Sequence, residues 1–254
     1  MTIAQELDSQ EGICQDVIFP PGDLYSDEPP LESELHLRQI ILLLTCLEWL
    51  WRDRNDFYAA GNLTIYYSPR QRKSEYFRGP DFFVVLGTER KTRKSWVVWE
   101  EDGKYPNVIL EILSNSTANT DKGLKKTIYQ DTFRTPDYFW FDPYTQEFAG
   151  FHLVDGEYQA LQASEQGYLW SHQLGLYLGV YEGLLRFFTR DGQLVPTPEE
   201  TAEQAEQKAE QAEQKAEQAE QKAEQAEQKA EQAEQKAERL AAKLRELNID
   251  LDTI

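Results

Sequence analysis

The spacing of apolar residues predicts a helix followed by several strands in the first half of the chain. Apolar positions recur at helical spacing through residues 32–51, which predicts an amphipathic helix. Short apolar runs next to turn residues then predict strands at 63–67, 82–86, 96–99 and 108–113. A polar turn at 114–117 leads into a helix from about residue 120 to 133. Further strands are expected at 138–141, 148–154 and 158–161. This order of elements predicts an α/β (α+β) fold of moderate size.

Two carboxylates interrupt the apolar runs of neighbouring predicted strands. Asp81 stands directly before Phe82, and Glu111 lies inside the run 108–113. Period-two alternation places Glu111 on one strand face with Ile109 and Leu113. A buried carboxylate costs several kcal/mol unless it is paired or bound to a metal ion. Two of them on adjacent strands therefore predict a divalent-cation site and a metal-dependent active site.

The predicted helix after the second acid carries a polar face. Asp121, Lys125 and Tyr129 recur every four residues, so they share one side of the helix and can face Glu111 across the short turn. A lysine there can orient a water molecule or stabilise charge on a phosphate. A solvated Asp121–Lys125 pair, contributing a few tenths of a kcal/mol, explains the same spacing.

The net charge of −19 is unusual for a nucleic-acid-binding protein, but the sign reverses locally. In residues 70–94, which we call the basic window, eight basic residues oppose three acidic ones on both sides of Asp81. A basic patch around an acidic metal site suits a phosphodiester substrate such as DNA. An exposed hairpin tip accounts for these charges equally well. The candidate nucleic-acid-binding residues are Arg70, Arg72, Lys73, Arg78, Arg90, Arg93 and Lys94.

The remaining composition predicts a cytoplasmic protein without a membrane segment. The N-terminus lacks the basic and apolar regions of a signal peptide, and the longest apolar stretch, near residues 40–47, is too short to span a bilayer.

Cys14 and Cys46 do not have metal-ligand spacing, and Cys46 is expected to be a buried thiol. We predict an irregular arm at 1–30, one domain at 31–196 and a helical tail at 197–254.

The tail has a seven-residue repeat. The unit Ala-Glu-Gln-Ala-Glu-Gln-Lys occurs five times from Ala202 to Lys236, with alanine at the a and d positions. Leucines continue the same register as Leu240, Leu244, Leu247 and Leu251. Lysine at g and glutamate at e favour a parallel coiled coil, most simply a homodimer. The alternative is an isolated alanine-rich helix, which alanine's helix propensity permits.

Together these motifs resemble the PD-(D/E)XK nuclease superfamily, and most closely its bacterial "putative restriction endonuclease" family of the Uma-two type. The matching pieces span roughly residues 25 to 190. They are Gly79-Pro80-Asp81, the segment Pro106-Asn107-Val108-Ile109-Leu110-Glu111-Ile112-Leu113-Ser114, the Ser116-Thr117 turn, the helix face described above, and residues 138–143. The resemblance implies a restriction-endonuclease-like core, a central mixed sheet flanked by helices. It also implies phosphodiester hydrolysis that depends on Mg²⁺ or Mn²⁺.

The resemblance also implies roles for individual residues. Asp81 and Glu111 are the two acids, and the backbone carbonyl of Ile112 joins them as a metal ligand. The superfamily usually has a lysine two positions after the second acid, where this chain has Leu113. Lys125 is the best replacement, with Lys122 and Lys126 behind it. Glu32, His36, Asp121 and Tyr129 are the candidates for supporting roles, and a structural histidine is the alternative interpretation of His36.

The resulting hypothesis is a Mg²⁺-dependent endonuclease acting on DNA. Two alternatives remain open from the sequence. One is a catalytically degenerate scaffold that acts through coiled-coil oligomerisation. The other is a metal-dependent hydrolase of a small phosphorylated substrate.

Overall fold

A computed structural model describes residues 22–28, 31, 33–68, 79–114 and 121–246 of the chain. The chain divides into two compact units, residues 1–197 and 198–254. The first unit is a mixed α/β domain and the second contains one long helix, so the predicted fold class is confirmed.

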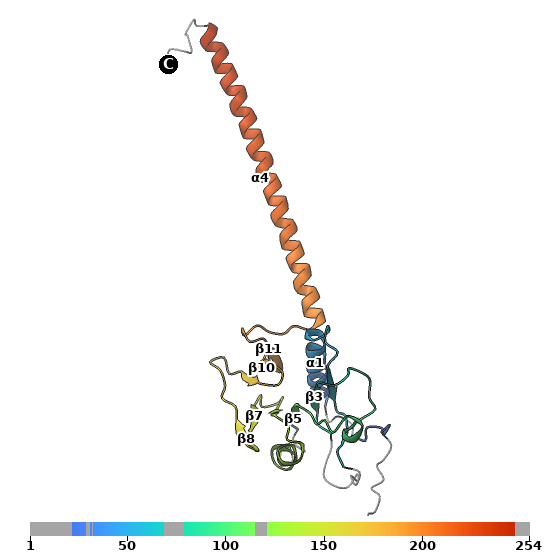
Figure 1. Ribbon diagram of the computed structural model, residues 1–254. Helices are drawn as coiled ribbons and strands as arrows, with labels where there is room; N and C mark the ends of the chain where they lie inside the picture. The colour runs from blue at the N-terminus through green and yellow to red at the C-terminus, as the bar shows by residue number, and fades with distance from the viewer. Residues whose placement is uncertain (1–21, 29–30, 32, 69–78, 115–120, 247–254) are drawn as a thin grey trace, which may run out of the picture. The chain divides into compact units, whose positions relative to one another are not determined.

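A mixed β-sheet forms the centre of the first unit (Figure 1). In the described part of the chain it has six strands in the order β1-β3-β5-β6-β7-β8. The strands are β1 (Phe57–Gly61), β3 (Phe82–Leu86), β5 (Val108–Ile112), β6 (Asp137–Phe141), β7 (Phe148–Val154) and β8 (Glu157–Ala160). Strands β5 and β6 are parallel because a helical crossover joins them, and the other neighbours pair antiparallel. The crossover consists of η2 (Asp121–Lys125), α3 (Lys126–Ile128) and η3 (Tyr129–Phe133).

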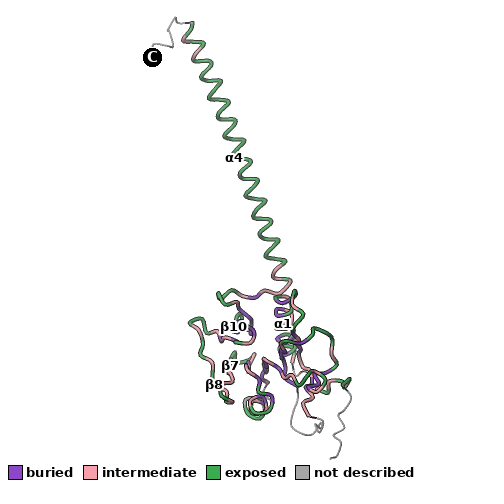
Figure 2. Tube along the Cα trace, in the orientation of Figure 1, coloured by how far each residue is buried: buried purple, intermediate pink, exposed green. Residues whose placement is uncertain are grey.

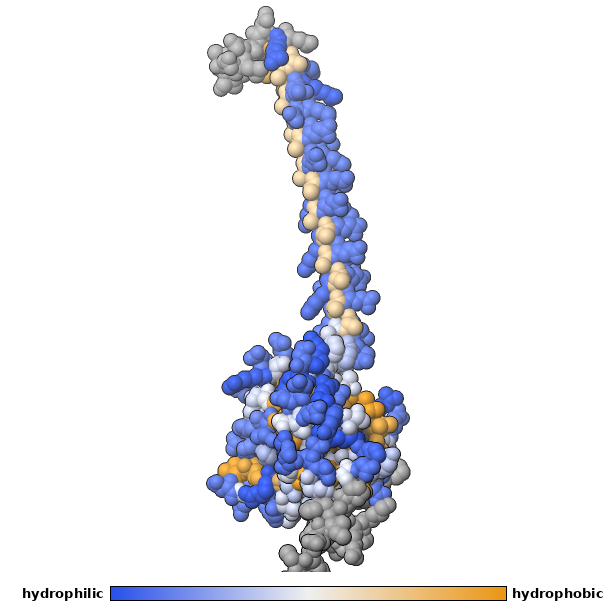
Figure 3. Space-filling model, turned by 45° about the vertical axis from the view of Figure 1, so that its right-hand side comes forward, coloured by the Kyte–Doolittle hydropathy of each residue, from blue (hydrophilic) through white to orange (hydrophobic). Residues whose placement is uncertain are grey.

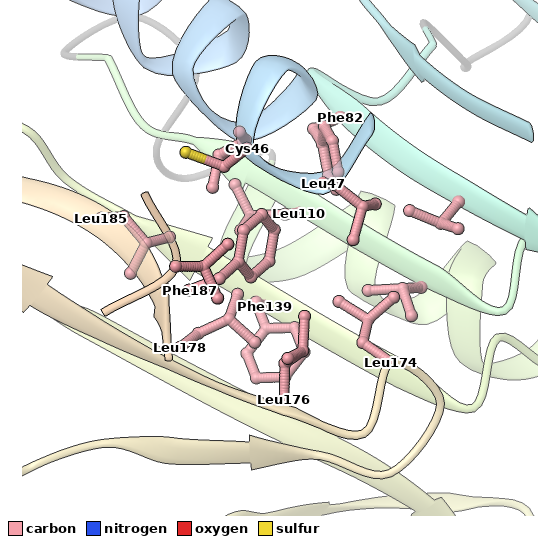
Figure 4. Packing of buried hydrophobic residues seen from close by; sticks show 14 of the residues in the cluster. Cys46, Leu47, Phe82, Leu110, Phe139, Leu174, Leu176, Leu178, Leu185 and Phe187 are labelled. Atoms are coloured by element: carbon pink, nitrogen blue, oxygen red, sulfur yellow. The ribbon is translucent and has the colours of Figure 1, made fainter. Parts of the chain in front are cut away.

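One face of the sheet packs against helix α1 (Glu34–Leu50) and a small antiparallel sheet. The small sheet contains β9 (Leu169–Ser171), β10 (Leu176–Tyr181) and β11 (Leu184–Phe188). Phe82, Leu110 and Phe139 point from the central sheet into this core, where they meet Leu47 of α1 and Leu178 of β10 (Figure 4). Cys46 is buried there as a free thiol, as predicted.

The opposite face of the central sheet carries an aromatic core. Phe83, Ile109 and Tyr138, one position along from the residues above, pack there with Tyr129 and Phe133 of the crossover. This period-two division is what strands buried on both faces require. A short parallel pair, β2 (Ile65–Tyr66) and β4 (Trp96–Val97), and the turn η1 (Val98–Glu100) complete the secondary structure before β5.

Buried hydrogen bonds fix the position of helix α1. The Ser33 side chain caps its N-terminus by accepting a hydrogen bond from the His36 amide. Gln39 is fully buried. Its side-chain amide donates to the Leu185 carbonyl oxygen of β11 at 2.8 Å and accepts from the Leu185 amide at 3.0 Å. These contacts hold the first turn of α1, and with it His36, in one place.

Several predicted elements match the structure closely. The strands at 82–86 and 148–154 have the predicted bounds, and the first helix and the strand around Glu111 differ by one or two residues at their ends. Strand β1 and the strands β9 to β11 were not predicted. The predicted strand at 96–99 was too long, because the chain turns into η1 after Val97. The predicted arm at 1–30 is not separate in its described part: Thr64 bonds the amide of Asp27 and the carboxylate of Glu28.

The second unit contains helix α4 (Pro198–Glu246), 49 residues long. At about 1.5 Å per residue its axis is about 74 Å long. Its described side chains are almost all exposed (Figure 2). A weakly hydrophobic stripe runs along it between hydrophilic side chains (Figure 3), as the alanines of the repeat require. Among the described residues, no helix is long and apolar enough to cross a membrane.

Candidate active site

The structure brings the two predicted acids together on one face of the central sheet. Phe82 pairs with Leu110, and continuing this antiparallel register by one residue sets Asp81 opposite Glu111. The Asp81 amide nitrogen lies 3.4 Å from Glu111 Oε2. Both side chains lie on the face that the helical crossover covers, as the alternation of β5 predicts.

Glu111 is fully buried and contacts two side chains of the crossover. Lys125 Nζ lies 3.0 Å from Glu111 Oε2, and the Tyr129 hydroxyl donates to Glu111 Oε1. The ammonium group balances the buried carboxylate, which would otherwise be costly to bury. The predicted helix face is therefore confirmed for Lys125 and Tyr129. Asp121 lies in η2, but its side chain is outside the described residues.

The crossover has the wider π-type hydrogen bonding at both ends, over residues 121–125 and 129–133. Such turns are rare and occur often at functional sites. Lys125 and Tyr129 each lie at the junction of a π-type turn with the central α-helical turn. The neighbouring Lys126 points elsewhere: its Nζ lies 3.4 Å from the centroid of the Phe151 ring. The structure thus separates Lys125 from Lys126, which the sequence left as alternatives.

Asp81 is held by groups from two other elements. His36 Nε2 lies 3.0 Å from Asp81 Oδ1, and the Ile112 amide donates to Asp81 Oδ2 at 2.8 Å. Burial alone would raise the pKa of Asp81, but the His36 hydrogen bond, the Lys125 charge and the Ile112 amide outweigh it. The net result is an Asp81 pKa below its ordinary value.

We expect this lowered pKa to make stability depend on pH in the acidic range. A carboxyl whose pKa is lower in the folded state stabilises the fold fully above its unfolded pKa of about 3.9. The contribution disappears as pH falls through the folded-state pKa. The difference in unfolding free energy between wild type and Asp81→Asn, measured by urea denaturation, should shrink as pH falls below about 4. A difference that grows as pH falls from about 4 would contradict this assignment.

Glu28 and Gly79 are two positioning residues that sequence patterns did not identify. Glu28 accepts a hydrogen bond from the Gly79 amide, two residues before Asp81. A Cβ atom at Gly79 would lie 2.2 Å from the Leu63 carbonyl oxygen, so only glycine fits this approach. The Gly-Pro-Asp motif therefore has a packing reason. Glu28 had no detectable signal, because it lies in a segment without periodicity. Glu32 is outside the described residues.

The described part of the basic window lies away from the acid pair. Asp81 precedes β3, whereas Arg90, Arg93 and Lys94 come after its other end. The strand from Asp81 to Leu86 is about 17 Å long, at about 3.3 Å per residue. Arg93 binds Glu101 through two nitrogens, at 2.5 and 2.9 Å, and its side chain is only 5% exposed. It also stacks over Tyr58 and Trp96. Arg93 therefore stabilises the fold and is not presented to an external phosphate.

The other basic candidates divide into two groups. Arg90 lies 3.7 Å from a Glu48 oxygen and Lys94 lies 3.6 Å from an Asp23 oxygen, both in partly exposed pairs. Such pairs are weak, so either side chain can exchange its partner for a phosphate. Arg70, Arg72, Lys73 and Arg78 lie outside the described residues.

The donor set suits a hard divalent cation bound through oxygen. Within the described residues, no three His, Cys, Asp or Glu side chains are grouped as metal ligands. Mg²⁺, however, needs only one or two protein carboxylates, because it keeps several of its waters and binds substrate phosphate. Asp81 and Glu111 supply two carboxylates on facing strands. Lys125 contacts Glu111, so a bound ion would share that carboxylate with the ammonium group. The two carboxylates fit such an ion.

Two family models match the chain. A family described as "Putative restriction endonuclease" matches residues 11–184. A family described as "Alanine-zipper, major outer membrane lipoprotein" matches residues 195–245. Among solved structures, a "putative nuclease belonging to DUF820" from Anabaena variabilis is similar, with 12% identity and a TM-score of 0.42 over 58% of this chain and 77% of that chain. No curated protein matches the chain.

Proposed function

The chain belongs to the family described as "Putative restriction endonuclease", and from this premise we propose that it is a metal-dependent endonuclease hydrolysing phosphodiester bonds of DNA. The observation that supports this proposal best is the buried cluster around the acid pair. Glu111 contacts Lys125 at 3.0 Å, and Asp81 contacts His36 at the same distance. If these positions served stability alone, apolar side chains would fill them at a lower free-energy cost than buried charged groups.

Restriction-endonuclease-like families generally use divalent metal ions, and we propose Mg²⁺, with Mn²⁺ as a substitute. Asp81, Glu111 and the Ile112 carbonyl would hold the ion. When bound, it would polarise the scissile phosphate and lower the pKa of a coordinated water. His36 and the Ile112 amide keep the Asp81 carboxylate ionised and oriented for this purpose.

Lys125 is the proposed counterpart of the lysine that Leu113 replaces. Its ammonium group reaches the acid pair from the crossover helix, on the side of the sheet where Glu111 points. From there it can orient a water molecule or stabilise the negative charge that develops on the phosphate. Tyr129, one turn later, donates to the other Glu111 oxygen and fixes the orientation of that carboxylate. The four undescribed basic residues before Gly79 are proposed to hold flanking phosphates without reading sequence.

Plasmid nicking tests the function directly. We expect the full-length protein to convert supercoiled plasmid to nicked or linear DNA in Mg²⁺ or Mn²⁺, and to stop when a chelator removes the ion. A chelator-resistant activity would point to a contaminant. If calorimetry shows metal binding but neither single- nor double-stranded DNA is cut, the endonuclease proposal fails. Assaying hydrolysis of phosphorylated small molecules would then distinguish the two alternatives, a catalytically inactive scaffold and a hydrolase of a small phosphorylated substrate.

We further propose that α4 forms a parallel coiled-coil homodimer, which the match to an alanine-zipper family supports. No lysine of the repeat has a glutamate three or four residues away. Lys208, for example, has Gln204, Ala205, Gln211 and Ala212 at those positions. A parallel partner would instead offer Glu213 to Lys208, because each g position faces the e position of the next heptad. An antiparallel pair would set like charges together.

The leucines should supply most of the dimer's affinity, because alanine buries little apolar area. We expect sedimentation equilibrium to show a dimer for the full chain and a monomer when Leu240, Leu244, Leu247 and Leu251 become alanine. Replacing the f-position glutamines Gln207, Gln214, Gln221 and Gln228 by alanine is the matched control and should leave the dimer intact. In a Cys14→Ser background, Ala209→Cys should form an interchain disulfide only if the helices are parallel. A monomeric wild type would overturn this proposal.

A further inference from the structure

A third buried carboxylate lies on the face of the central sheet opposite to the acid pair. Asp137 is the first residue of β6 and is fully buried. It lies on the same face as Phe139 and Phe141, where the small sheet packs. It pairs in register with Val108 at the start of β5, whereas Glu111 is near that strand's end. Asp137 therefore has no part in the proposed nuclease chemistry.

Three hydrogen bonds connect Asp137 to two separate segments. Its Oδ1 lies 2.7 Å from His152 Nδ1 on the neighbouring strand β7, and its Oδ2 accepts from the Ser171 hydroxyl at 2.7 Å and the Gln173 amide at 2.9 Å. Ser171 and Gln173 are the residues on either side of His172. One carboxylate thus orients the His152 ring directly and anchors the backbone of His172 on both sides.

Further contacts make this arrangement rigid. The Ser171 hydroxyl also accepts from the Leu174 amide at 3.1 Å, and the Asn107 side chain donates to the Gln173 side chain at 3.0 Å. The turn that presents His172 is therefore tied to the central sheet at several points. A side chain on such a turn is held in place before any ligand arrives, which lowers the entropic cost of binding.

The two imidazole rings lie side by side and open to solvent. Their centroids are 4.5 Å apart, with an angle of 35° between the ring planes. The His152 side chain is 27% exposed, and His172 is exposed. With metal–nitrogen bonds of about 2.0–2.1 Å, two imidazoles on adjacent coordination positions have centroids about 4.5–5 Å apart. The observed spacing needs little adjustment to fit one shared ion.

We propose that His152 and His172 form a binding site for a divalent transition-metal ion such as Zn²⁺, Ni²⁺ or Cu²⁺. Imidazole nitrogen suits these ions, whereas the oxygen donors at Asp81 and Glu111 suit Mg²⁺ or Mn²⁺. Metal-binding histidines commonly give their other ring nitrogen to a carboxylate, as His152 does to Asp137. That bond leaves His152 Nε2 for the ion. Within the described residues no third His, Cys, Asp or Glu completes a ligand group, so water would have to supply the remaining ligands of a bound ion.

Copper provides the most specific test, because its paramagnetic resonance spectrum counts the coordinating nitrogens. One equivalent of Cu²⁺ is added to the full-length protein with excess Mg²⁺ present to occupy the acid pair. We expect a spectrum with two imidazole nitrogens for wild type. His172→Ala, at an exposed position, should fold normally, show one nitrogen and bind Zn²⁺ about tenfold or more weakly by calorimetry.

His36→Gln is the matched control, since His36 is the chain's third histidine and contacts Asp81 instead. It should leave the two-nitrogen spectrum unchanged. Asp137→Asn, if its circular dichroism matches wild type, should weaken Zn²⁺ binding about 10–100-fold, because the ring orientation is lost. The proposal is wrong if wild type shows no two-nitrogen spectrum, if His172→Ala keeps it, or if His36→Gln removes it.

Discussion

Glu111→Gln should reduce DNA cleavage by at least about 10²–10³-fold, the loss typical of removing one essential electrostatic group from an active site. Glutamine keeps the volume of the side chain and can still accept the Tyr129 hydrogen bond. It removes the negative charge that attracts a metal ion and that balances Lys125. Cleavage of a supercoiled plasmid under single-turnover conditions measures the effect, and calorimetry measures the loss of Mn²⁺ binding.

This substitution also breaks a buried ion pair, which commonly costs about 3–5 kcal/mol, so loss of stability needs a control. Glu101→Gln provides it. Glu101 pairs with Arg93 in the same domain, with side chains 13% and 5% exposed. The Glu101→Gln substitution should lower the thermal unfolding midpoint but leave DNA cleavage by the folded protein nearly unchanged. Equal losses of activity in the two variants would mean that stability, and not metal binding, explains the result.

Lys125→Met should lower the cleavage rate by about 10²–10⁴-fold, the range for removing a group that moves protons or stabilises charge in the transition state. Methionine retains most of the apolar length of the side chain but not its ammonium group. Metal affinity should not fall, because the cation that competes for Glu111 is gone. The measurement pairs single-turnover nicking with a Mn²⁺ titration, and separates a role in chemistry from a role in metal binding.

The adjacent Lys126 is the matched control for Lys125. Its ammonium group lies over the Phe151 ring, away from Glu111, and burial lowers its pKa. Lys126→Met should therefore change the rate only slightly. Equal effects of the two substitutions, or a Lys125→Met variant that loses metal along with activity, would show that Lys125 does not have the proposed role.

The sequence alone identified most residues of the buried cluster around Glu111, because their positions depend on local patterns. Asp81 is recognisable as a carboxylate directly before an apolar strand and Glu111 as one within an apolar strand, and register then sets them opposite each other. Lys125 and Tyr129 share a helix face through their four-residue spacing, and the structure confirms that both reach Glu111. The helical tail is equally predictable from sequence, because its seven-residue repeat is invariant and has helical spacing.

Other elements escaped prediction because their residues do not alternate cleanly. Strand β1 reads Phe-Tyr-Ala-Ala-Gly, and small residues there suit close packing rather than a strand pattern. Strands β9 to β11 gain their stability from packing on the central sheet, so their short apolar runs carry little signal alone. In both cases tertiary contacts, and not intrinsic preference, determine the secondary structure.

The tertiary structure alone decided which polar residues meet. Glu28 reaches Gly79 across 51 residues, and His36 approaches Asp81 because Gln39 anchors α1 to β11. Arg93, a candidate for phosphate binding by charge, is instead buried on Glu101. Local sequence specifies which face a side chain occupies, but pairing between distant segments depends on chain topology. The same reason explains why His152 and His172 showed no pattern until one buried carboxylate brought them together.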